Sequence, residues 1–296
     1  MLDSAIRQIA ASRDGTRAAA AFFSSTVQIW DLDAAECATQ FQSVLDFGGH
    51  RLDLSPDGSR CVVASWRGGS DAGVACHDTM TGFQLWHRPD VMETQHISFC
   101  LKQLGIWCIA DSGAAIRIDD SNGKTLEERR GIERIIESPY FDHRLVERHR
   151  GGYVLEGPER VLLPKNSFAL LDAAIGLDEV CIAEPRAPLR CLRLSGEERW
   201  RFDIGPGRQF VRVWFSSAQS RFFALATSLG SGPTAIVAFE PATGQAREIS
   251  KFSSWDAAAA PDANRFITCH GDLHRLSDGD LVASLAFPQT VYPDKD

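Results

Sequence analysis

Two histidines near the C-terminus have a spacing that could bind a metal ion. His270 and His274 are four residues apart, which on a helix would place both imidazoles on one face. They flank Gly271-Asp272, however, which predicts a hairpin turn. Outside a helix, a spacing of four residues does not place the two imidazoles on one face. We therefore expect no metal site here.

Other motifs of enzyme chemistry are incomplete. The run Asp119-Asp120-Ser121-Asn122-Gly123 has ligand types of a calcium loop but lacks the remaining ligands and the final Glu, so we expect an Asx-type turn. The Gly-x-Ser-x-Gly elbow of serine hydrolases is absent. None of the eight cysteines forms a Cys-x-x-Cys pair, and most lie in apolar runs, where Cys serves as a small apolar residue. The sequence thus predicts no catalytic residue, metal or cofactor.

The stretch 52–86 shows which elements position the remaining polar residues. It contains four short apolar runs, and the turns between them include Ser55-Pro56-Asp57-Gly58 and Asp78-Thr79-Met80-Thr81-Gly82. Short apolar runs bounded by Gly, Pro, Asp and Ser predict β-strands joined by turns. This stretch therefore predicts one four-stranded antiparallel blade.

Imperfect copies of this blade fill the chain at a period of about 42 residues, which is typical of β-propellers. We predict a single all-β domain over 1–296, a seven-bladed β-propeller. Its blades are expected at about 5–45, 50–90, 95–130, 131–165, 168–204, 210–250 and 254–288.

Several predicted strands are apolar at consecutive positions, for example 18–23 and 222–226. A strand with one face in water would alternate between apolar and polar residues, so these strands are expected to pack between two neighbouring blades. The first and last copies each supply their own four strands. The ring is therefore predicted to close by packing, without a clear swapped strand.

Ser55-Pro56-Asp57-Gly58 and Ile29-Trp30-Asp31 resemble the signatures of WD-repeat propellers. Asp78-x-x-Thr81-Gly82-x-x-x-Trp86 resembles the repeat of quinoprotein-type propellers, and Leu194-Ser195-Gly196 with Trp200 is a weaker match. The resemblance implies that these tryptophans dock onto the adjacent blade. It implies no particular chemistry, because these motifs specify turns and packing.

Composition restricts the classes of partner. The net charge is −8 and the pI about 5.5, which disfavours nucleic acid and could attract a basic partner. No signal peptide and no apolar run of membrane-spanning length is seen, so we expect a cytoplasmic protein without membrane contact. Arg far outnumbers Lys, which suggests a bacterial source.

The first functional hypothesis is a non-enzymatic module that binds a partner protein, including the special case of an immunity protein that neutralises a basic protein. Loops after the second strand and links between blades share one face and are long here, and binding residues concentrate on such loops. Trp and Arg are common interface anchors, although packing between blades would equally explain the tryptophans and solvation the arginines. The candidate residues are Trp66, Arg67, Arg208, Gln209 and Trp255.

The alternative hypothesis is an enzyme or small-ligand-binding propeller with its site at the mouth of the central channel. It needs titratable residues from several innermost strands. The candidates are His50, Asp53, His96, Asp172 and Asp256. A third feature is the concentration of arginine in blades three and four, which predicts either solvated strand edges or a docking patch for an acidic segment. These residues are Arg129, Arg130, Arg134, Arg144, Arg148 and Arg150.

Overall fold

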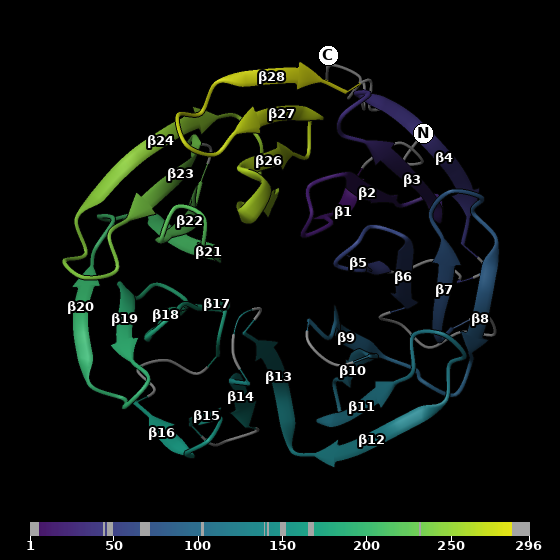
Figure 1. The fold of residues 1–296 in the computed structure, drawn as a ribbon, viewed down its shortest axis with the longest axis horizontal. Coiled ribbons are helices and arrows are strands. Elements are labelled where there is room, and N and C mark those ends of the chain that lie inside the picture. Colours follow the sequence, from purple (N-terminus) through teal and green to yellow (C-terminus); the bar gives the residue numbers. More distant parts are fainter. Residues whose placement is uncertain are drawn as a thin grey trace.

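A computed structural model gives the fold as seven four-stranded antiparallel sheets arranged in a ring (Figure 1). The structure describes residues 6–43, 45, 50–65, 72–101, 104–138, 140, 142–148, 152–164, 169–230 and 232–285. Every sheet consists of four strands consecutive in sequence, with the first innermost and the fourth at the rim. The predicted all-β, seven-bladed propeller is therefore confirmed.

The strands of blades one to four are short and regular. Their bounds are β1 Ile6–Ala11, β2 Arg17–Phe22, β3 Thr26–Asp31, β4 Glu36–Gln42, β5 His50–Leu54, β6 Arg60–Ser65, β7 Val74–Asp78, β8 Gln84–Arg88, β9 Thr94–Phe99, β10 Ile106–Ala110, β11 Ala114–Ile118, β12 Thr125–Arg130, β13 Ile132–Glu137, β14 Arg144–Arg148, β15 Tyr153–Glu156 and β16 Val161–Leu163.

Blades five to seven complete the ring. Their strands are β17 Asp172–Ile175, β18 Glu179–Ala183, β19 Leu189–Arg193, β20 Glu198–Phe202, β21 Arg208–Ser216, β22 Arg221–Ser228, β23 Thr234–Phe239, β24 Ala246–Phe252, β25 Ala257–Ala260, β26 Arg265–Thr268, β27 Asp272–Arg275 and β28 Leu281–Ser284. A single turn of 3-10 helix, Pro261–Ala263, follows β25. Within the described ranges, no helix is long and apolar enough to cross a membrane.

The turn between the first two strands is built from a Ser-x-Asp-Gly pattern that folds locally. In blade two, the Ser55 hydroxyl donates to the Asp57 carboxylate at 2.6 Å, and the same carboxylate accepts the Ser59 backbone N–H at 3.1 Å. Gly58 has φ of +68°, a left-handed conformation that glycine adopts without steric cost. Blade one repeats the arrangement with Ser12 and Asp14, so the motif predicts the turn at both places.

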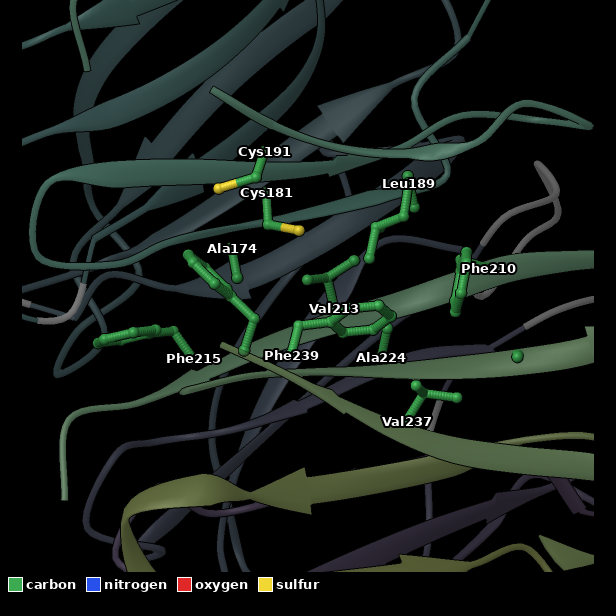
Figure 2. Close-up of a cluster of buried hydrophobic side chains, with 13 residues drawn as sticks. Ala174, Cys181, Leu189, Cys191, Phe210, Val213, Phe215, Ala224, Val237 and Phe239 are labelled. Carbon is green, nitrogen blue, oxygen red and sulfur yellow. The ribbon is translucent and has the colours of Figure 1, made fainter. Parts of the chain in front are cut away.

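The hydrophobic core is divided among the seven interfaces between neighbouring blades, one cluster at each. Ala18 to Ala21 are completely buried on both faces of β2, as the continuous apolar runs predicted. Figure 2 shows the cluster between blades five and six, where Cys181 and Cys191 lie near Phe239 of the next blade. All eight cysteines lie in the described part of the chain; they are free, and seven are buried.

Two tryptophans dock onto the following blade, as the quinoprotein-like repeat implied. The Trp86 indole N–H donates to the Asp120 carbonyl at 2.8 Å, and the Trp200 indole N–H donates to the Pro241 carbonyl at the same distance. Each indole lies against the glycine of that blade's last turn. A Cβ on Gly244, for example, would lie 2.7 Å from the Trp200 ring.

The ring closes by packing between blades seven and one. Strands β25 to β28 form one sheet and β1 to β4 another, so no strand is exchanged between them within the parts of residues 6–285 that the structure describes. Ile9 and Ala18 of blade one share a cluster with Ile267 and Leu273 of blade seven. At the turns of this interface, Arg265 and Asp33 form an ion pair at 2.7 Å. Closure without a swapped strand is therefore confirmed.

Candidate functional site

A central cavity of about 950 Å³ is lined by the innermost strands of all seven blades. These strands are β1, β5, β9, β13, β17, β21 and β25 (Figure 1). We call the two ends of the ring the loop face, which carries the second-to-third-strand loops and the links between blades, and the turn face, which carries the other turns. Each innermost strand starts at the loop face and runs toward the turn face.

The register of the blades places one polar residue from each innermost strand at a common level, and we call this set the channel ring. Six of the pairs with the second strand are Gln8↔Ala21, Arg51↔Ala64, His96↔Ile109, Arg134↔Glu147, Asp172↔Ala183 and Arg212↔Leu225. Asp256 is the seventh member, since its carbonyl accepts the Cys269 N–H at 3.1 Å. All seven line the cavity.

β-Bulges help to set this ring. The register shifts by one residue directly before Gln8, His96, Arg134 and Arg212. A bulge adds an unpaired residue and re-aims the side chains that follow it. Four blades of different sequence therefore present a polar residue at the same level of the channel.

On the side of blades five to seven, the ring charges compensate one another. Arg212 pairs with Asp256, with Nη2–Oδ2 at 3.1 Å, and Asp172 accepts the Val213 backbone N–H at 2.8 Å. The pKa of Arg212 is raised, first by Asp256 and further by Asp172, against the opposing effect of burial. Burial raises the pKa of Asp172, while Arg212 and Arg134 oppose that rise.

On the side of blades one to four, the channel ring has no carboxylate. Burial lowers the pKa of Arg51, and the positive charges of Arg7, Arg134 and Arg212 lower it further. Burial is also the main cause that lowers the pKa of Arg134, which donates to the Leu171 carbonyl of the next blade. His96 lies between them in blade order; burial and the three ring arginines hold its pKa well below 6.5, so it is neutral at pH 7.

Asp53 lies two residues beyond Arg51, one layer closer to the turn face. Its Oδ2 accepts the Phe99 backbone N–H of blade three at 2.8 Å, and its Oδ1 accepts the Leu54 N–H at 2.9 Å. Burial nevertheless raises the pKa of Asp53 from 3.8 to about 6, because desolvation outweighs these hydrogen bonds.

At the turn face, Tyr140 of blade four reaches across the channel. Its hydroxyl donates to Asp262 of blade seven at 2.7 Å and accepts the Ser217 backbone N–H of blade six at 3.0 Å. Arg13 of blade one pairs with Asp262 at 2.7 Å, and its Cζ lies 4.7 Å from the Tyr140 ring centre. This cluster links four blades, so it obstructs one mouth of the cavity.

At the loop face, the mouth is bordered by small and polar residues of blades six and seven, including Ser228, Gly230 and Ser253. Trp255 lines this mouth and is 54% exposed, and Leu229 in the neighbouring loop is 51% exposed. Among the described residues, exposed apolar side chains therefore lie beside the loop-face end of the cavity.

The five predicted partner-binding residues have different positions. Trp255 is exposed, whereas Arg208 and Gln209 are half-buried at the start of β21. The Nε and Nη2 atoms of Arg208 are buried and have no hydrogen-bond partner among the described residues. Trp66 and Arg67 lie outside the described residues, and their predicted role stays a prediction.

Of the alternative channel residues, Asp53, His96, Asp172 and Asp256 line the one cavity. His50 is the first residue of β5, and its side chain lies outside the described part. The sequence interpretation missed Gln8, Arg51 and Arg212. Each of these three residues comes directly before an apolar residue of its innermost strand, at the same place in its repeat. An alignment of the repeats with one another would therefore have found them.

The other candidate groups have structural roles. His274 stacks on Phe266 with ring centres 4.8 Å apart, and His270 is exposed in a turn. Within the described ranges, no group of three or more His, Cys, Asp or Glu residues could hold a metal ion. The described arginines of blades three and four do not share one surface: Arg129 and Arg144 pair with Glu156, while Arg134 lies in the channel. Arg150 lies outside the described residues.

No family model matches the chain, and no curated protein is similar to it in sequence. The likeness to WD-repeat and quinoprotein-type propellers therefore concerns turns and packing. The propeller fold itself is shown by the seven sheets, and the fold alone does not determine a function.

Proposed function

We propose that this protein is a binding module whose partner is a protein that contacts the loop face around the channel mouth. The observation that carries the proposal is the difference between the two mouths. Tyr140 and its partners obstruct the turn face, whereas Trp255 is exposed beside the mouth at the loop face. Tryptophan is enriched among residues that dominate binding energy, and exposed apolar clusters mark interaction surfaces.

A basic protein is the proposed kind of partner, including the case of a toxic protein that this chain neutralises as an immunity protein. The support is the net charge of −8. A negative net charge accelerates association with a positively charged protein, and salt screens this attraction. Raising the ionic strength should therefore slow the association with the captured partner; a rate independent of salt contradicts the basic partner but not the loop-face contact.

The test of the loop-face contact is affinity capture from the source organism with wild type and two variants, followed by mass spectrometry and measurement of Kd. Trp255→Ala should weaken binding of the stoichiometric partner about tenfold or more. Leu162→Ala is the matched control, because Leu162 is 75% exposed on the rim strand β16. Equal loss in both variants, or none in Trp255→Ala, overturns the proposal.

A second candidate function is small-ligand binding or catalysis in the channel. It is favoured by the convergence of Asp53, His96, Asp172 and Asp256 on one cavity. Ligand sites are concave and carry a few convergent polar groups with shifted pKa values.

A further inference from the structure

The rim of the propeller presents the outer edges of seven fourth strands. Each of these strands stands at one end of its sheet, so no described strand pairs with its outer edge (Figure 1). An edge strand offers backbone N–H and C=O groups to which another chain can add a strand. Proteins usually prevent such pairing by keeping edge strands short or by placing charged side chains on them.

Most of the rim strands are protected in one of these ways. Strands β16 and β28 have only three and four residues. Strands β12, β20 and β24 each contain at least three charged side chains. Strand β8 has five residues and ends with Arg88.

Strand β4 is the least protected edge. It has seven residues, as many as β24, but its one charged residue, Glu36, stands at its start. Five of its seven residues are exposed, against three of seven in β24. The pairing of β4 with β3 skips Ala38, but a shift of this kind occurs in five other rim strands as well. Length, exposure and lack of charge therefore distinguish β4 from the other edges.

Exposed apolar side chains lie beside this edge. The Thr39 hydroxyl of β4 donates to the Met80 carbonyl at 2.8 Å, so the turn between β7 and β8 lies against β4. Met80 is 64% exposed, and Phe83, at the end of the same turn, is 74% exposed. Exposed apolar residues that gather in this way mark an interaction surface.

The sequence of β4 is compatible with antiparallel pairing of the strand with a second copy of itself. Such pairing about the middle of the strand places Glu36 opposite Gln42, and no like charges face each other. The same pairing of β24, the equally long rim strand, would place Arg247 opposite Lys251. Like charges directly opposite each other destabilise a strand pair. The charges therefore permit self-pairing at β4 and oppose it at β24.

We propose that two copies of this chain associate through antiparallel pairing of β4 with β4 of the second copy, with Met80 and Phe83 beside the contact. The backbone hydrogen bonds of the added strand supply the affinity, as in other cases of strand addition. The contact is two-fold symmetric and occupies the whole edge, so association ends at a dimer. This inference concerns the rim and does not rest on the proposed loop-face partner.

The test is sedimentation equilibrium of the full chain over a wide range of concentrations. With rising concentration, the wild type should reach a mass twice that of the 32.5 kDa chain and no higher. Because both copies carry a net charge of −8, added salt should not weaken the dimer, in contrast to the binding of a basic partner. A mass that stays that of one chain at every concentration overturns the proposal.

A double variant locates the contact. Ala38→Lys with Gln40→Lys places lysine opposite lysine at two positions of the paired strands, and should raise the Kd of the dimer about tenfold or more. The control is Leu126→Lys with Leu162→Lys, which adds the same charge to exposed positions of β12 and β16. A dimer that is unchanged in the β4 variant, or equally weakened in the control, overturns the proposal.

A single variant covers the case in which the β4 double variant does not fold. Gln40 accepts a hydrogen bond from the Gln28 side chain at 2.9 Å, and the double variant loses it. Ala38→Lys keeps this bond and should still weaken the dimer, by less than the double variant. An Ala38→Lys protein that is folded and dimerises as the wild type does would contradict pairing through β4.

One further comparison separates this inference from the loop-face proposal. Trp255→Ala should lose the captured protein partner and keep the dimer, whereas the β4 double variant should lose the dimer and keep the partner. If the wild type is monomeric and the β4 double variant loses the captured protein, the edge binds an extended segment of that protein, and the second-copy assignment is wrong.

Discussion

At the scale of single residues, Asp53 connects the chemistry of the channel with the stability of the protein. Its carboxylate joins β5 to β9 through the Phe99 N–H, yet burial raises its pKa from 3.8 to about 6. A carboxyl group with a raised pKa in the folded state binds its proton more tightly there than in the unfolded chain. Its contribution to stability is therefore largest below pH 4 and decreases as the pH rises toward 6.

Asp53→Asn removes this dependence. When the pH rises from about 4 to 7.5, the unfolding free energy of the wild type should fall relative to that of the variant. The fall due to this group is at most about 3 kcal/mol. The amide changes the local hydrogen bonds, but that offset is nearly independent of pH. Urea unfolding of both proteins at pH 4 and pH 7.5 measures the difference. An identical difference at the two pH values contradicts the assigned protonation of Asp53.

Residue types alone could not predict all the side chains that line the channel. Asp53, His96, Asp172 and Asp256 were recognisable as titratable residues on innermost strands, whereas no motif in the sequence singled out Arg51 and Arg212. Their position in the channel depends on register and on bulges before residues such as Arg212. Neither is encoded in a local motif.

At the scale of elements, the contact between a strand-four tryptophan and the next blade's turn glycine joins neighbouring blades. Gly244 has φ of +71°, and a Cβ there would lie 2.7 Å from Trp200. Gly131 has nearly the same φ, +69°, with no atom within 4 Å of such a Cβ. The two glycines therefore separate backbone strain from steric conflict with the indole.

Gly244→Ala should destabilise the protein by about 1–3 kcal/mol more than Gly131→Ala, because overpacking adds to the strain common to both. In a Trp200→Ala background, the cost of Gly244→Ala should fall to that of Gly131→Ala. Denaturant midpoints of the four proteins and the double variant measure this coupling. Additive effects of Trp200→Ala and Gly244→Ala would show that the indole does not restrict the turn.

The cluster around Tyr140 that obstructs the turn face could not be predicted from the sequence either. Tyr140 lies in blade four, and its partners Arg13 and Asp262 are more than a hundred residues away in the chain. Contacts of this kind depend on loops that meet across the ring. By contrast, the Ser-Asp-Gly turns fold through neighbours in sequence, so their motifs predicted the blades.

At the scale of the whole molecule, the repeat period in the sequence predicted the architecture but not the properties of the surface. Seven sequence copies predicted seven sheets, and completeness of the first and last copies predicted closure by packing. The asymmetry between the two faces arises instead from individual side chains, Tyr140 on one and Trp255 on the other. The functional proposals depend on that asymmetry.

Hydrogen–deuterium exchange of the protein alone and in complex with its captured partner tests the loop-face proposal most directly. The account predicts slower exchange in the complex at 227–230, 232–234 and 253–257, which border the loop-face mouth, with rim strands such as β8 and β16 unchanged. Protection confined to the rim strands or to the turn face, with none at the loop-face mouth, would contradict it.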